Sequence, residues 1–301
     1  MTVPASVFVA GSANLDFVVH APHIPAPGET VLGREFQTFP GGKGANQAIA
    51  CARAGGVATR MLLALGDDPF ARPIEDSLNE AGVHLKVVRS TEARTGTAFI
   101  CVSDDAENAI TVAPGANAKL RGDDLPILNG VTHLLLQLET PIKSVTEMAQ
   151  RARAAGVVVV LNAAPVQALP RELLASVDVL VVNKGELGAI SGPAASLHDA
   201  LARIDVPFVI VTLGEDGCCA RTPGGMLTQA AFQVDPLDTT AAGDTFCGVL
   251  VAALSEGAPL SDALRTASAA AAIACTRLGA QPSIPTRAEV TAFLQSAQLI
   301  A

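Results

Sequence analysis

Residues 238–248, with the sequence DTTAAGDTFCG, place small residues and a carboxylate at the start of a helix that the following apolar run predicts over residues 242–256. The first backbone amides of a helix are unpaired and carry roughly +0.5 of an elementary charge. Ala241, Ala242 and Gly243 leave room for an oxygen to approach those amides. The stretch therefore predicts an anion-binding site with Asp244 beside it, although an aspartate at a helix start also stabilises a helix by itself.

A second glycine-rich turn, GGKGANQA over residues 41–48, also leads into an expected helix, residues 44–55. It lacks the GxxxxGK[ST] pattern of a phosphate-binding P-loop, and its glycines do not fit the dinucleotide-binding fingerprint. The glycines permit close backbone approach, and Lys43 and Asn46 supply hydrogen-bond donors.

Polar residues recur where expected strands end. GSANLD (residues 11–16) carries Asn14 and Asp16, which can bind vicinal hydroxyls or bond their own turn, and Glu139 ends another strand. Asn183 and Glu186, in NKGE, are one helical turn apart, a spacing that suits a hydrated Mg²⁺ or an exposed polar helix start. TLGEDG (residues 212–217) has two glycines that could lie against a nucleotide.

The elements that must position these residues alternate along the chain. Near-continuous apolar runs predict buried strands at residues 6–12, 60–66, 133–138, 157–165, 177–183 and 207–214, with helices between most of them and over 242–256, 260–277 and 286–298. This pattern predicts one α/β domain over residues 1–301, with a doubly wound, mainly parallel sheet and helices on both faces. Two β-rich segments, about 14–40 and 95–113, should form a small lid over the carboxyl ends of the strands.

Composition excludes several classes of function. The 301 residues are 50% hydrophobic with a net charge of −9 and no run of Lys and Arg, which argues against nucleic-acid binding. No apolar run reaches the roughly 18 residues of a membrane span, and the N-terminus is not typical of a signal peptide. The six cysteines lack CxxC spacing and predict reduced thiols in a cytoplasmic protein.

The chain resembles the ribokinase branch of the ribokinase-like (PfkB) carbohydrate kinases. The resemblance extends over nearly the whole chain and rests on a series of motifs in this order: GSANLD, PAPGET, GGKGANQA, TGTAFI, ENAITVAPGAN, QLE, NKGE, VTLGEDG, DTTAAGDTF and AAIACTRLGAQPSIP. GGKGANQA and DTTAAGDTF are the most specific of them. The chain departs slightly from the family at Ala241, where many members have Gly, and at residues 162–165, where NAAP replaces NPAP.

The resemblance implies transfer of the γ-phosphate of ATP to the 5-hydroxyl of D-ribose in a ribokinase-type reaction. It makes Asp244 the base, expected with an ordinary pKa near ~3.9, and the backbone of Ala241, Ala242 and Gly243 the site that stabilises the moving phosphoryl group. The positions that match the sugar site are Asn14, Asp16, Gly42, Lys43, Asn46 and Glu139. Those that match the nucleotide site are Asn183, Thr212, Gly214, Gly217, Gly243 and Ser268.

The resemblance also implies two cations and a partner. Glu186, with Asn183, would organise Mg²⁺ and the phosphates. A K⁺ ion would be bound, mostly through carbonyl oxygens, at Asp238, Thr240, Ala274, Arg277, Gly279 and Ser283. The lid would pair with that of a second subunit in a homodimer, which would also cover its edge strands.

Other functions stay open on the sequence alone. A kinase of the same family could act on 2-deoxyribose, a nucleoside or another sugar, although the chain has no Trp or Tyr to stack on a base. A non-catalytic sugar or nucleotide sensor could use the same fold, but the expected catalytic Asp244 is present. A nicotinamide-dependent dehydrogenase is disfavoured because the dinucleotide fingerprint is missing.

Overall fold

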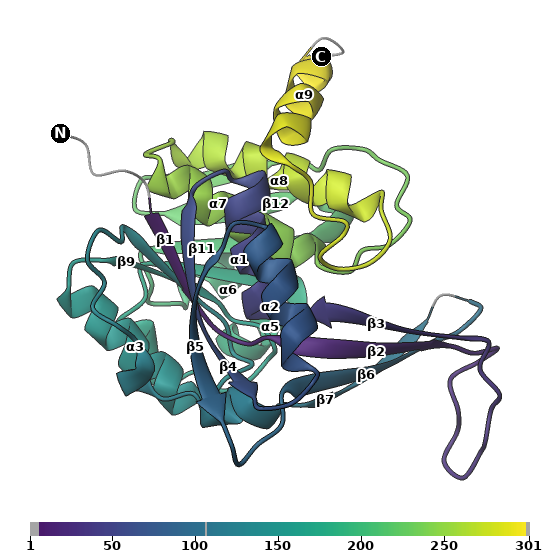
Figure 1. The fold of residues 1–301 in the computed structure, drawn as a ribbon. Helices are drawn as coiled ribbons and strands as arrows, with labels where there is room; N and C mark the ends of the chain where they lie inside the picture. The colour runs from purple at the N-terminus through teal and green to yellow at the C-terminus, as the bar shows by residue number, and fades with distance from the viewer. Residues whose placement is uncertain (1–5, 106, 299–301) are drawn as a thin grey trace.

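The computed structural model describes residues 6–105 and 107–298, and Figure 1 shows their arrangement around two sheets. The main sheet has nine strands in the order β13-β12-β11-β10-β9-β8-β1-β4-β5. The seven strands from β11 to β5 are parallel, and β12 and β13 extend the sheet in antiparallel fashion. The strands are β1 (Ser6–Ala10), β4 (Ala58–Gly66), β5 (His84–Ser90), β8 (His133–Leu136), β9 (Val158–Asn162), β10 (Val179–Asn183), β11 (Phe208–Thr212), β12 (Cys218–Thr222) and β13 (Gly225–Gln229).

Helices cover both faces of this sheet, because side chains along a strand alternate between the faces. On β1, Val7 and Val9 pack into one hydrophobic cluster, while Phe8 and Ala10 pack into the other. The first cluster lies under α1 (Lys43–Ile49), α2 (Ala71–Glu80), α7 (Ala242–Ser255), α8 (Leu260–Cys275) and α9 (Arg287–Gln298). The second lies under α3 (Ile142–Ala154), α4 (Arg171–Leu174), α5 (Lys184–Ser191) and α6 (Leu197–Ala202).

The second sheet has the order β3-β2-β6-β7 and extends away from the main sheet (Figure 1). Its strands are β2 (Asn14–His20), β3 (Glu35–Gly41), β6 (Gly96–Val102) and β7 (Asn108–Ala113). β2 pairs antiparallel with β3, β6 pairs antiparallel with β7, and β2 joins the two hairpins through parallel pairing with β6. Because β2 begins four residues after β1 ends, this lid starts at the carboxyl end of the central strand.

The architecture confirms the predicted doubly wound α/β fold with a small β-lid, and the three predicted C-terminal helices are α7, α8 and α9. Two details differ. The predicted helix over residues 44–55 is α1 followed by a π-helical turn, Ala50–Ala54, in which the Gly55 amide donates to the Ala50 carbonyl at 2.9 Å. β5, β12 and β13 were not expected, because their sequences mix polar and small residues with few apolar ones.

Residues singled out in the sequence lie at the carboxyl ends of the parallel strands. Short 3₁₀ turns at Gly115–Lys119, Gly122–Asp124 and Gly214–Asp216 complete the connections.

None of the helices in the described part of the chain combines the length and the apolar character needed to cross a membrane. The six cysteines are all free thiols.

Candidate active site

The N-terminus of α7 has the open geometry that the sequence predicts. Ala241 has φ 58°, a left-handed conformation that glycine adopts more easily than alanine. The Ala242 amide donates to the Thr239 carbonyl at 3.2 Å, and the Thr245 amide donates to the Ala241 carbonyl at 2.8 Å. Within the described residues the amides of Gly243 and Asp244 have no such partner, and a Cβ at Gly243 would meet open space. These amides can therefore donate hydrogen bonds to a bound anion.

Asp244 lies on the first turn of α7 and is only 7% exposed. Its Oδ2 accepts a hydrogen bond from Asn46 Nδ2 at 2.9 Å, and its Oδ1 accepts one from Gln47 Nε2 at 2.9 Å. Burial raises the pKa of Asp244, while the Lys43 ammonium and the two amides act to lower it. The ordinary pKa expected from the sequence is therefore wrong, because the carboxyl group is buried.

Lys43 begins α1 and places its ammonium among carboxylates. The nearby Asp244 is the main cause of its raised pKa, which burial opposes, and Glu139 and Glu186 add to the rise. Gly42, which precedes the helix, has φ 89°, and a Cβ there would lie 2.9 Å from the Ala13 Cα. Only glycine therefore allows α1 to begin so close to the end of β1.

Glu139 is held by the two turns that it faces. Its Oε2 accepts from Ser12 Oγ at 2.6 Å and from the Lys43 amide at 3.0 Å. Ser12 Oγ in turn accepts from the Gly44 amide at 3.2 Å. This carboxylate thus joins the ends of β8, β1 and the glycine-rich turn.

Asp16 faces the same group of charges from the lid. Burial raises its pKa to about 7, and the negative charges of Glu139 and Asp244 add to the rise. A Cβ at position 41 would collide with the Asp16 carboxylate, so Gly41 is required for it to lie there. The structure therefore brings Asp16, Lys43, Glu139 and Asp244 into one electrostatically coupled cluster.

Asn14 is buried at the base of the lid, and its Oδ1 accepts from Asn117 Nδ2 at 2.8 Å. Asn117 also accepts from the Ala13 amide at 3.0 Å and donates to the Ala13 carbonyl at 3.1 Å. Asn117 was not singled out in the sequence, because it lies 103 residues from Asn14. It fixes the orientation of Asn14 where β1 passes into the lid.

Asn183 and Glu186 cap α5. Asn183 Oδ1 accepts from the Glu186 amide, and Glu186 Oε2 accepts from the Asn183 amide, both at 2.8 Å. This reciprocal pair is a capping box. Glu186 is 6% exposed, its pKa is raised by burial, and its charge is coupled to Lys43 and Asp244. The pair therefore stabilises the helix and also places one carboxylate near the cluster.

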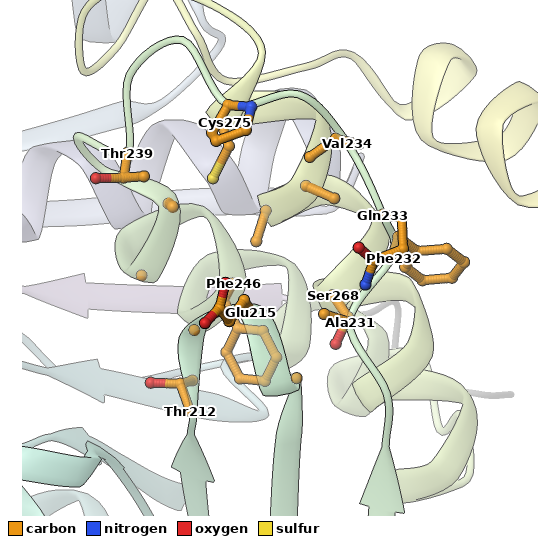
Figure 2. A pocket seen from close by; sticks show the side chains of 17 residues that line it. Thr212, Glu215, Ala231, Phe232, Gln233, Val234, Thr239, Phe246, Ser268 and Cys275 are labelled. Carbon is orange, nitrogen blue, oxygen red and sulfur yellow. The ribbon is translucent and has the colours of Figure 1, made fainter.

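A cavity of about 510 Å³ adjoins the N-terminus of α7. It is lined by the predicted nucleotide-site residues Thr212, Gly214, Gly217, Gly243 and Ser268, but not by Asn183. Figure 2 shows Thr212, Glu215 and Phe246 at one end and Phe232, Gln233 and Val234 along one side. The residues from 231 to 234 were missed in the sequence, because this loop carries no pattern beyond mixed polarity. The size of the cavity suits a small organic ligand.

The loop before α7 is tied to the chain after α8. Asp238 Oδ1 accepts from the Thr240 amide and Oδ2 accepts from the Gly279 amide, both at 2.8 Å. The amides of Leu237 and Asp238 donate to the Cys275 carbonyl at 2.7 and 3.1 Å. Burial acts to raise the pKa of Asp238, but the hydrogen bonds from Thr240 and Gly279 prevail and lower it. The Asp238 carboxylate therefore joins the loop before α7 to the segment after α8 in which the other expected cation-site residues lie.

The other residues expected at this cation site lie in the same region. The Arg277 amide donates to the Ala274 carbonyl at 3.1 Å, directly after α8. Ser283 is fully buried, and its hydroxyl donates to the Ala280 carbonyl at 2.7 Å. Over residues 6–105 and 107–298 no group of three or more His, Cys, Asp or Glu side chains is suited to hold a metal ion. An Mg²⁺ ion at Glu186 would therefore need water and ligand phosphates as its further ligands.

Gln47 and Gln137 are functional-site residues that the sequence reasoning missed. Both are fully buried, and Gln137 Nε2 donates to Gln47 Oε1 at 2.7 Å. Gln47 could have been found from its spacing, because it follows Lys43 by four residues and therefore shares its face of α1. Gln137 directly precedes Leu138 and Glu139 but carried no signal of its own.

The chain is similar to known proteins over nearly its whole length. The chain is 38% identical to ribokinase from Haemophilus influenzae in an alignment that covers 96% of this chain and 98% of the relative. The crystal structure of ribokinase from Thermotoga maritima matches with a TM-score of 0.92 and 37% identity over 97% of this chain and 99% of that one. Arabidopsis thaliana ribokinase, solved with ribose and ATP, matches with a TM-score of 0.89 and 34% identity over 98% and 99%. Residues 4–287 match the profile described as pfkB family carbohydrate kinase, and the chain therefore belongs to this family.

Proposed function

We propose that this protein is an ATP-dependent ribose kinase that transfers the γ-phosphate of ATP to the 5-hydroxyl of D-ribose. The observation that carries the proposal is the position of Asp244, one residue beyond the open Gly243 amide and next to Lys43. A base, an anion site and a cation thus meet beside a cavity of nucleotide size. The ribokinases to which the chain is similar support ribose as the sugar.

In the proposed reaction Asp244 accepts the proton of the 5-hydroxyl as the sugar oxygen attacks the γ-phosphorus. The new oxygen–phosphorus bond forms while the bond from the γ-phosphorus to the β–γ bridging oxygen breaks, and ADP leaves. The amides at the start of α7 and the Lys43 ammonium stabilise the negative charge of the moving group. Asp244 can do this only when ionised, which Lys43, Asn46 and Gln47 favour against burial.

The sugar hydroxyls would be bound by the residues that surround this point: Asn14, Asp16, Gly42, Lys43, Asn46 and Glu139. Glu186 would hold Mg²⁺ through water, and bound Mg²⁺ would neutralise phosphate charge. The loop of Asp238, Thr240 and Gly279 would hold K⁺ with carbonyl oxygens of the 274–283 segment. K⁺ there would fix the loop from which α7 begins.

The lid favours a homodimer. The strand register places Ile110 opposite Ile100 and Val112 opposite Ala98, on the same face of the lid as Asp16. Ile110 is 55% exposed and Val112 is 42% exposed. An apolar sheet face of this kind, bounded by the edge strand β7, would be covered by the lid of a second copy.

The test is ADP release from Mg-ATP in the presence of K⁺, with D-ribose, 2-deoxyribose, adenosine and fructose offered in parallel. Turnover that favours ribose, with ³¹P NMR showing phosphate on the 5-oxygen, is the expected result. Turnover with another of the four compounds would support the proposed kinase reaction but would replace ribose as its substrate. No turnover from folded protein that binds ATP would favour the sensor function instead.

A further inference from the structure

Gln47 links the candidate base Asp244 to Asn162 and Gln137 through its side-chain amide. Its side chain is fully buried on α1, and Nε2 donates to Asp244 Oδ1 and to Asn162 Oδ1, both at 2.9 Å. Its Oε1 accepts from Gln137 Nε2 at 2.7 Å. Both amide protons and the oxygen of this buried side chain are therefore engaged.

The direction of these hydrogen bonds is fixed from one backbone group. The Val181 carbonyl can only accept, and it accepts from Asn162 Nδ2 at 3.3 Å. The Asn162 side-chain oxygen therefore faces Gln47, and the Gln47 NH₂ group must be the donor of the hydrogen bond between them. The same NH₂ group then donates to Asp244. A reversed Gln47 amide would set its oxygen against two other oxygens, which is costly in a buried site.

We propose that Gln47 is a positioning residue for Asp244. Gln47 holds Oδ1 and the adjacent Asn46 holds Oδ2, so two neighbouring residues of α1 fix the rotation of the carboxylate. Each carboxylate oxygen keeps lone pairs for the attacking hydroxyl. Because both hydrogen bonds favour the ionised form, they also oppose the effect of burial on the base. This role rests on the proposed kinase function only for its effect on turnover.

The first test uses Gln47→Met, which keeps the length of the side chain and removes its hydrogen bonds. The value of kcat should fall about 10- to 100-fold, as expected for one lost hydrogen bond to a charged group, while KM for ribose and for ATP changes little. The acid limb of the kcat–pH profile should move to higher pH. Ser144→Ala is the matched control. It removes a buried hydroxyl on α3 that donates to the Leu120 carbonyl at 2.7 Å, and the kcat–pH profile of this variant should not move.

The pKa of Asp244 gives a readout that does not need turnover. In a ¹³C NMR titration of carboxyl-labelled protein, assigned with Asp244→Asn, the Asp244 signal should titrate at higher pH in Gln47→Met than in the unaltered protein. If ribose is not a substrate but this shift is present, the inference holds and the proposed function fails. An unchanged Asp244 pKa overturns the inference, whatever the substrate.

A double-mutant cycle separates positioning from general damage. If Gln47 acts through Asp244, Gln47→Met should cause no further loss of kcat in the Asp244→Asn background. Losses that multiply would overturn the inference. Should Gln47→Met not fold, Gln137→Met takes its place, because it leaves Gln47 present but releases its oxygen. It should shift the Asp244 pKa in the same direction, and an unchanged pKa there would contradict the role.

Discussion

Asp16→Asn should stabilise the sugar-free protein at neutral pH and weaken ribose binding at the same time. The pKa of Asp16 is raised from 3.8 to about 7, first by burial and then by Glu139 and Asp244. In the unfolded chain the group ionises near its ordinary pKa, whereas in the folded protein it keeps its proton until about pH 7. Stability from this group is therefore lost as pH rises from about 4 to about 7 and is constant above that range.

The magnitude follows from the shift of about 3 pKa units, each worth about 1.36 kcal/mol. The free energy of unfolding of the unaltered protein should fall by up to roughly 4 kcal/mol between pH 4 and pH 8 because of Asp16. Asparagine cannot ionise, so the stability difference between the variant and the unaltered protein should grow by this amount over the same range. At pH 8, where Asp16 is ionised, KM for ribose should rise about 10- to 100-fold in the variant, since an ionised acceptor for a sugar hydroxyl is lost.

The assay is urea unfolding followed by far-UV circular dichroism from pH 4 to pH 8, without sugar or nucleotide. Circular dichroism is the suitable signal because the chain has no Trp or Tyr. Asp205→Asn, at an exposed position outside the site, is the matched control. A difference between Asp16→Asn and the unaltered protein that stays constant with pH would refute the reasoning, as would an unchanged KM.

Three further predictions concern the rest of the site. Gly243→Val should lower kcat about 10²- to 10³-fold with little change in Tm, because its side chain would enter the open space beside the anion site; normal turnover would contradict this. Replacing K⁺ by tetramethylammonium should lower activity about 10-fold or more by releasing the loop before α7, and unchanged activity would argue against a cation there. Ile110→Asp should give a monomer in light scattering, because it places a charge on the exposed apolar face of the lid. Ile127→Asp, at an exposed position outside the lid, should stay a dimer. A dimeric Ile110→Asp would contradict the lid interface.

The main elements of the fold could be predicted because each carries a local signal. The strands of the parallel sheet are continuous apolar runs, and α7 begins at Ala242 as its small residues and following apolar run indicate. The antiparallel strands β12 and β13 could not be predicted, because they contain polar and small residues. Their pairing is fixed by the neighbouring β11, which is a tertiary effect.

The sequence pointed to the charged residues of the candidate site, but the reasoning from it missed Gln47 and Gln137 and the raised pKa of Asp16. Asp16, Lys43, Glu139 and Asp244 lie close together because the start of the lid strand β2, the loop after β8 and the first turns of α1 and α7 meet at the carboxyl ends of the parallel strands. The raised pKa of Asp16 arises from burial and from charges more than 100 positions away along the chain. Gln47 likewise gains its importance from Asp244, 197 residues later.

The most direct test of the account compares Asp244→Asn with the unaltered protein in ribose-dependent ADP formation, with the Kd for ATP measured in parallel by calorimetry. In Asp244→Asn we expect kcat to fall about 10²- to 10⁴-fold, the usual contribution of general-base catalysis, with the fold and the Kd for ATP unchanged. Near-normal turnover in Asp244→Asn would contradict the central claim that this carboxylate is the base at the start of α7.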